Sequence, residues 1–204
     1  MSDDTLDRDE KHKKKSQKLK EKVDAHIDTA TIETGTILLL TGNGKGKSSS
    51  AFGMVMRSLG YNYKVGIVQF IKGVQLSGEE LYIQNQHPEV PFYQMGTGFT
   101  WDTQDRSGDI AAAEATWVQA AAMLKDESLH LVVLDELTYM LGYDYLDETM
   151  VLEALKNRPP EQTVVVTGRG GGKALTELAD TVTELKEVKH AYQAGVKARK
   201  GVDY

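Results

Sequence analysis

Short apolar runs alternate with amphipathic stretches from about residue 35 to the end of the chain. Each run is rich in Val, Ile, Leu or aromatic residues, and several are followed by glycine or acidic residues, as is typical of buried strands. The strands predicted on this basis span residues 36–41, 64–70, 90–95, 130–136, 163–169 and 181–188.

The stretches between these runs have helical periodicity. Residues 47–61 place Phe52, Val55, Met56 and Leu59 on one face of a predicted helix that ends near Gly60. The other predicted helices span the alanine-rich residues 109–124, then 148–158, which Pro159 stops, and 173–180.

Strands that alternate with helices pair in parallel and have both sheet faces covered. The runs "LLL" (38–40) and "LVVL" (131–134) show no polar alternation, which is the pattern of strands buried on both sides. The sequence therefore predicts an α/β fold, a mostly parallel sheet with helices on both faces.

Residues 1–34 are polar and have few large apolar residues. We predict a flexible or helical N-terminal extension there, followed by one compact domain over residues 35–204. Residues 11–22 hold seven lysines and one glutamate, a local charge of +6. Because the net charge of the whole chain is −6, the remaining residues together carry a charge of −12. An acidic body disfavours nucleic-acid binding, which draws on phosphate neutralisation; the basic segment is either a binding arm or, more commonly, a solvated helix.

The chain has no cysteine, which excludes disulfides, thiolate zinc sites and cysteine nucleophiles. No apolar stretch approaches the roughly 18 residues of a membrane-spanning helix, and the acidic N-terminus lacks the apolar region of a secretory signal. We therefore expect a cytoplasmic protein without membrane association. The five histidines show no metal-ligand spacing.

The segment "TGNGKGKSSS" (41–50) lies between a predicted strand and a predicted helix. Such a loop binds phosphate through converging backbone N–H groups and the helix N-terminus. In the usual phosphate-loop pattern the first glycine would fall at Thr41, but it comes one residue later, at Gly42. The predicted nucleotide-binding residues are Gly42, Asn43, Gly44, Lys45, Gly46, Lys47, Ser48 and Ser49.

Two acids, Asp135 and Glu136, end the apolar run at 130–136. Together with the Ser48 hydroxyl they are candidate ligands for Mg²⁺ (or Mn²⁺). Adjacent residues of a strand point to opposite faces, so one acid is expected to reach the metal. The alternative is a strand that merely ends in solvated acids, and periodicity does not say which acid binds the ion.

Six segments stand in an order that is specific to one family: "TGNGKGKSSSAFGMVMRSLG", "KVGIVQFIKG", "GTGFTWDTQD", "LVVLDELTYMLGYDYL", "TGRG" and "LADTVTELKEVKHAYQAGVKARKGVDY". Together they resemble the ATP:corrinoid adenosyltransferases that act on cob(I)alamin or cob(I)yrinic acid a,c-diamide. The resemblance covers residues 35–204 and implies a P-loop NTPase-like (RecA-like) fold. One departure is "GGK" (171–173), where relatives carry bulkier or different residues.

The resemblance implies that the Co(I) centre of a corrinoid attacks the ribose C5′ of ATP and that triphosphate leaves. ATP is then expected to lie reversed relative to ordinary NTPases, and under this resemblance the late position of Gly42 marks that reversal. It also implies a homodimer and a flavoprotein electron donor.

The resemblance assigns roles to individual residues. Lys47, Phe99 and Trp101 become catalytic, and the two aromatic residues form a wall beneath the corrin ring that excludes the lower axial ligand. Arg57 and Arg169 join the nucleotide-binding residues, and Glu136 is favoured over Asp135 as the metal carboxylate.

Three further interpretations stay open at the level of sequence. The chain could be another P-loop ATPase or a small kinase, or a non-catalytic, nucleotide-gated corrinoid carrier. The lysine-rich extension is a candidate lid over the bound substrates, contributed within one chain or across a dimer.

Overall fold

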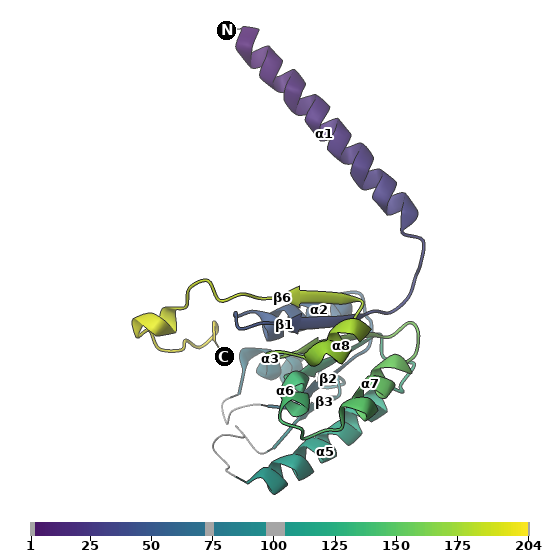
Figure 1. The fold of residues 1–204 in the computed structure, drawn as a ribbon, viewed down its shortest axis with the longest axis vertical. Coiled ribbons are helices and arrows are strands. Elements are labelled where there is room, and N and C mark those ends of the chain that lie inside the picture. Colours follow the sequence, from purple (N-terminus) through teal and green to yellow (C-terminus); the bar gives the residue numbers. More distant parts are fainter. Residues whose placement is uncertain (1–2, 72–75, 97–104, 204) are drawn as a thin grey trace. The chain divides into compact units, whose positions relative to one another are not determined.

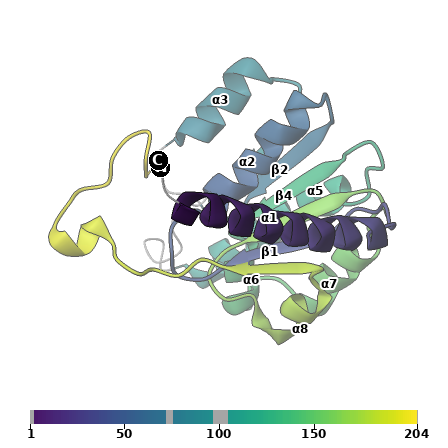
Figure 2. The same cartoon turned by 90° about the horizontal axis from the view of Figure 1, so that it is seen from above.

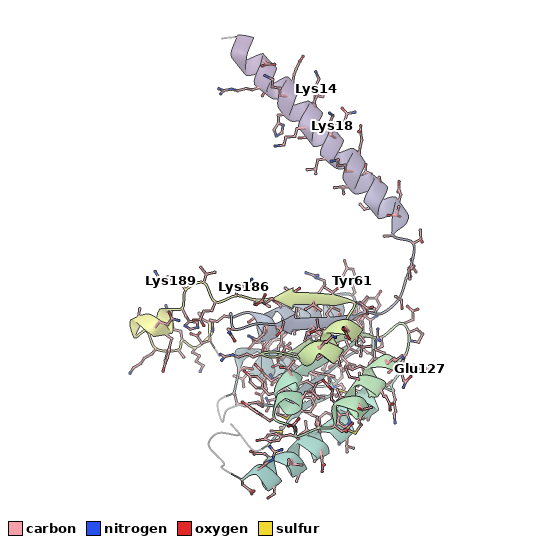
Figure 3. All side chains as sticks on the ribbon, viewed as in Figure 1. Lys14, Lys18, Tyr61, Glu127, Lys186 and Lys189 are labelled. Carbon is pink, nitrogen blue, oxygen red and sulfur yellow. The ribbon has the colours of Figure 1, made fainter. Side chains whose placement is uncertain are left out.

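The structure is a computed structural model that describes residues 3–71, 76–96 and 105–203. The chain divides into two compact units, residues 1–33 and 34–204. The first unit consists mainly of the helix α1 (Asp3–Thr29), from which Lys14 and Lys18 project (Figure 3). The second unit contains the sheet and the site described below.

The second unit is built on one six-stranded sheet in the order β3-β2-β4-β5-β1-β6 (Figure 1). All of its strand pairings are parallel. The strands are β1 (Ile37–Thr41), β2 (Val65–Gln69), β3 (Phe92–Gln94), β4 (Leu131–Asp135), β5 (Thr163–Thr167) and β6 (Thr181–Glu184).

Helices cover both faces of this sheet (Figure 2). They are α2 (Lys47–Gly60), α3 (Gly78–Gln86), α5 (Arg106–Met123), α6 (Leu137–Gly142), α7 (Glu148–Lys156) and α8 (Gly172–Leu178), with a short 3₁₀ helix η1 (Ala191–Ala194) near the C-terminus.

Alternate residues of the central strands enter two separate cores. Val132 and Leu134 of β4 pack with α5 to α8, whereas Leu131 and Val133 pack with Phe52 and its neighbours from α2 and α3. Because both faces are buried, these strands are apolar along their whole length. The predicted α/β fold is confirmed.

Two helices and the end of one strand were not expected from the sequence. The helix α3 was not predicted because it buries only Glu80 and Ile83 and has almost no apolar periodicity. The six-residue α6 was not predicted because it follows the β4 run without a polar break. The strand β6 ends at Glu184 rather than at residue 188.

The expectation that both acids lie in the β4 strand is wrong. That strand ends at Asp135, and Glu136 has a left-handed backbone with φ of 61°. Strand alternation therefore does not set the direction of the Glu136 side chain, because Glu136 lies in the turn into α6.

Candidate functional site

The phosphate loop (residues 42–49) connects the carboxyl end of β1 to α2. Gly46 precedes the helix with φ of 109°, a conformation that favours glycine. The Lys47 side chain is buried, and its Nζ donates to the carbonyls of Gly42 and Gly44, both at 2.8 Å. The ammonium group is thus held against the loop at the edge where parallel α/β sheets bind ligands.

The segment after β6 packs onto this loop. The Gly44 N–H donates to the Leu185 carbonyl at 2.7 Å, and a β-carbon on Gly42 would lie 2.4 Å from the same oxygen. Gly42 also has φ of 98°. The late first glycine therefore has a packing reason, since it lets the chain after β6 approach the loop.

Buried polar side chains stand at the ends of the neighbouring strands. Thr167 of β5 donates from Oγ1 to Asp135 Oδ1 at 2.6 Å, and Gln69 of β2 donates from Nε2 to Asp135 Oδ2 at 2.8 Å. Both oxygens of Asp135 are therefore engaged inside the protein. Asp135 thus accepts one hydrogen bond at each of its carboxylate oxygens.

The Glu136 carboxylate has different surroundings from that of Asp135. Its Oε2 is buried and has no hydrogen-bond partner within the described part of the chain. Burial and the neighbouring Asp135 charge raise the pKa of Glu136 to about 7, against the opposing effect of Lys47 and Arg169. An orphaned buried carboxylate oxygen beside a phosphate loop fits a hard divalent cation such as Mg²⁺.

The same environment shifts the pKa of Lys47 in the opposite direction from that of Glu136. Burial lowers the pKa of its ammonium group, and the nearby Arg169 charge lowers it further, while Glu136 acts to raise it. Cations and a buried acid therefore converge on one end of the site, as expected of a place that receives a strongly anionic group.

These groups line one cavity of about 1090 Å³. Its phosphate-loop side consists of residues 43–49, and its sheet edge consists of Gln69, Asp135, Glu136 and Arg169. The lining also includes a set of apolar residues, the apolar wall, which we define as Phe52, Met56, Ile71, Tyr82 and Ile83. The C-terminal tail, residues 185–203, closes another side with Glu187, His190, Gly201, Val202 and Asp203.

The structure brings most of the predicted site residues together. Asn43 to Ser49, Asp135, Glu136 and Arg169 all line the cavity, and Gly42 contributes its carbonyl to Lys47. Arg57 is exposed in the last turn of α2, and it is absent from the cavity lining that the described residues form. Phe99 and Trp101 lie outside the described residues.

Sequence reasoning missed Gln69, Thr167 and the tail. Gln69 ends the strand VGIVQ and Thr167 ends the strand TVVVT, and a polar residue directly after an apolar run is a signal that could have found them. No local signal marks the tail, in which Asp203 forms an ion pair with Lys45 of the phosphate loop. Figure 3 shows Lys186 and Lys189 on the stretch that leads away from β6 into the tail.

Two further features concern metal-binding clusters and membrane-spanning helices. Within the described residues, no group of three or more His, Asp or Glu side chains is arranged to hold a metal ion by itself. No helix in that part of the chain combines the length and apolar character needed to cross a membrane.

A family model described as ATP:corrinoid adenosyltransferase BtuR/CobO/CobP matches residues 33–204. The chain belongs to this family. Membership confirms the resemblance drawn from the sequence and with it the class of activity, the transfer of an adenosyl group from ATP to a corrinoid in cobalamin biosynthesis.

Curated relatives agree over nearly the full length of the chain. The corrinoid adenosyltransferase of Escherichia coli K12 is 52% identical over 196 residues, which cover 96% of this chain and 99% of that protein. The Pseudomonas aeruginosa enzyme is 52% identical over 97% of this chain and 98% of its own length. Corrinoid adenosyltransferase CobA of Salmonella typhimurium is 50% identical, with coverage of 96% and 99%.

Proposed function

We propose that the cavity binds ATP with its triphosphate on residues 42–49 and presents the ribose C5′ to a corrinoid substrate. The observation that carries this proposal is the convergence of Lys47, Arg169 and the unpartnered Glu136 Oε2 at one end of a single cavity. That end suits a metal–triphosphate group, because cations and loop N–H groups offset phosphate charge.

The reaction is an in-line displacement at carbon. The Co(I) centre of the corrinoid substrate donates an electron pair to C5′, a Co–C bond forms, the C5′–O bond breaks, and that bond's electron pair leaves on triphosphate. Cobalt is thereby oxidised to alkyl-Co(III). No side chain has to act as nucleophile, so the protein's work is alignment and stabilisation of the leaving charge.

Ser48 and Glu136 would hold Mg²⁺, or Mn²⁺, beside the phosphates. The ion supplies neutralisation of charge on the leaving triphosphate. Lys47 stays at the loop carbonyls within reach of the same charge, and Arg169 adds a forked donor from the turn after β5. Two protein ligands suffice because Mg²⁺ usually keeps waters and phosphate oxygens in its coordination shell.

The apolar wall supports a place for a flat organic group. Met56 and Tyr82 line the cavity and are exposed, with the buried Phe52 beside them in the lining, and ligand pockets are commonly lined by such apolar and aromatic side chains. Phe99 and Trp101 are proposed to exclude the lower axial ligand of the corrinoid. A homodimer, a cytoplasmic location, a flavoprotein reductant and a lid formed by the N-terminal extension belong to the same proposal.

The product of the reaction tests the proposal. The protein is incubated anaerobically with ATP, Mg²⁺ and chemically reduced cobalamin, and the adenosylcobalamin spectrum and released triphosphate are measured. We expect Lys47→Met to lower the rate about 100-fold or more, because a donor to the developing charge is lost. Lys156→Met, an exposed lysine at the end of α7, is the matched control and should keep the rate.

A different product would contradict the proposal. Release of ADP without corrinoid dependence would identify an ATPase or a kinase, and corrinoid binding without turnover would identify a carrier.

A further inference from the structure

A row of hydrogen-bonded polar side chains crosses the carboxyl edge of the sheet. This edge row consists of Gln94 of β3, Gln69 of β2, Asp135 of β4 and Thr167 of β5. The strand register places Gln94 beside Gln69 and Gln69 beside Asp135. Gln94 Nε2 donates to Gln69 Oε1 at 2.8 Å, and the two donors to Asp135 complete the row.

Thr167 is the member of the row that connects it to Glu136. Its hydroxyl donates to Asp135 Oδ1 at 2.6 Å and accepts the Glu136 backbone N–H at 3.0 Å. A hydroxyl has one hydrogen to donate and lone pairs to accept, so both capacities are used. Thr167 is fully buried, with no exposed surface.

Glu136 needs such a connection because its backbone is unfavourable. A non-glycine residue with φ of 61° persists only when its surroundings hold it. The hydrogen bond from Glu136 N–H to Thr167 Oγ1 holds the left-handed turn in which Glu136 leaves the strand. The Asp135 carboxylate in turn fixes the direction of the Thr167 hydroxyl.

We propose that Thr167 is a positioning residue for the metal carboxylate, holding the Glu136 backbone in the conformation that presents Oε2 to the metal–triphosphate group. This inference rests on the proposed metal role of Glu136. Groups that orient a ligand commonly control metal affinity by about 10- to 100-fold, so Thr167 is expected to govern the effect of Mg²⁺ on ATP binding. ATP binding without metal depends on the phosphate loop and is expected to be independent of Thr167.

The test uses Thr167→Val, which keeps the side-chain shape and removes the hydroxyl. The dissociation constant of ATP is measured by calorimetry on the full chain, with Mg²⁺ and with EDTA. For Thr167→Val we expect the tightening of ATP binding by Mg²⁺ to shrink about ten-fold or more, while the constant in EDTA stays at the wild-type value. General damage to the fold would weaken both constants together.

Three companion variants sharpen the result. Thr167→Ser keeps the hydroxyl and should restore the wild-type Mg²⁺ effect. Thr163→Val makes the same change at the opposite end of β5, where Thr163 Oγ1 accepts the Thr36 N–H at 3.3 Å, and should leave both constants unchanged. Should Thr167→Val not fold, Thr167→Cys replaces the hydroxyl by a weaker hydrogen-bonding thiol and should shrink the Mg²⁺ effect to a smaller extent.

A full Mg²⁺ effect in a folded Thr167→Val protein overturns the inference and leaves the proposed function intact. Absence of any Mg²⁺ effect in the wild-type protein overturns the metal role of Glu136, and the inference with it.

Discussion

At the scale of single residues, two adjacent acids have different surroundings. Asp135 ends a strand and accepts hydrogen bonds from Thr167 and Gln69. Glu136 turns out of the strand and leaves a buried oxygen unpartnered within the described residues. The second arrangement is costly for a carboxylate and is therefore typical of a functional group.

This cost predicts a pH-dependent stability. Burial raises the pKa of Glu136 from 4.5 to about 7, so between these pH values the folded protein binds a proton that the unfolded chain has released. The free energy of unfolding should therefore fall as the pH rises through this range. Glu136→Gln removes the charge and should raise the free energy of unfolding at pH 8 by up to about 3 kcal/mol, with no difference near pH 4.

Urea denaturation at both pH values measures this difference. The control is Glu127→Gln, an exposed acid, which should change the stability little at either pH. An effect of Glu136→Gln that does not depend on pH would contradict the assignment.

At the scale of elements, the chain that follows β6 contacts the phosphate loop and constrains its shape. Leu185 donates its N–H to the Thr41 carbonyl and accepts the Gly44 N–H. The Gly44 N–H is therefore engaged within the protein. The reversed position of ATP stays a proposal, because the glycine spacing has this packing reason of its own.

Two glycine substitutions separate loop packing from general glycine effects. Gly42→Ala should lower the free energy of unfolding by about 1–3 kcal/mol, because φ of 98° is unfavourable and the new β-carbon meets the Leu185 carbonyl. Gly53→Ala lies in α2, where a β-carbon meets no atom within 4 Å, and should raise it by about 0.5–1 kcal/mol. Chemical denaturation measures both, and a neutral Gly42→Ala would contradict the packing argument.

At the scale of the whole second unit, the fold joins parts of the chain that are far apart in sequence. Residues 45 and 203 meet as an ion pair at the cavity, although 158 positions separate them. The pair with Lys45 lowers the pKa of Asp203, so the tail places a carboxylate on a cation that the proposed triphosphate also needs.

If Asp203 and a bound triphosphate compete for Lys45, removing the Asp203 charge should strengthen triphosphate binding. Asp203→Asn should strengthen the binding of inorganic tripolyphosphate, measured by calorimetry at low salt, by up to about five-fold, since exposed ion pairs contribute modest energies. Glu184→Gln changes the charge equally, at an acid that pairs with Lys186 and not with the loop, and should have no effect. Weaker binding in Asp203→Asn would mean that the tail supports the anion instead of competing with it.

The sequence by itself determined the α/β class, the phosphate loop and the family. Buried parallel strands leave continuous apolar runs, and a phosphate loop is contiguous in sequence, so both are readable from local pattern. Asp135 and Glu136 were also found, because acids that follow an apolar run stand out.

Only the tertiary structure decided which hydrogen bonds and packing contacts these residues make. The turn at Glu136, the hydrogen bonds of Thr167 and Gln69 to Asp135, and the approach of Leu185 to Gly42 all depend on neighbours in other strands. The return of the tail to Lys45 likewise has no local pattern. Contacts between distant segments arise from the order of strands in the sheet. Local patterns in a single sequence do not predict that order.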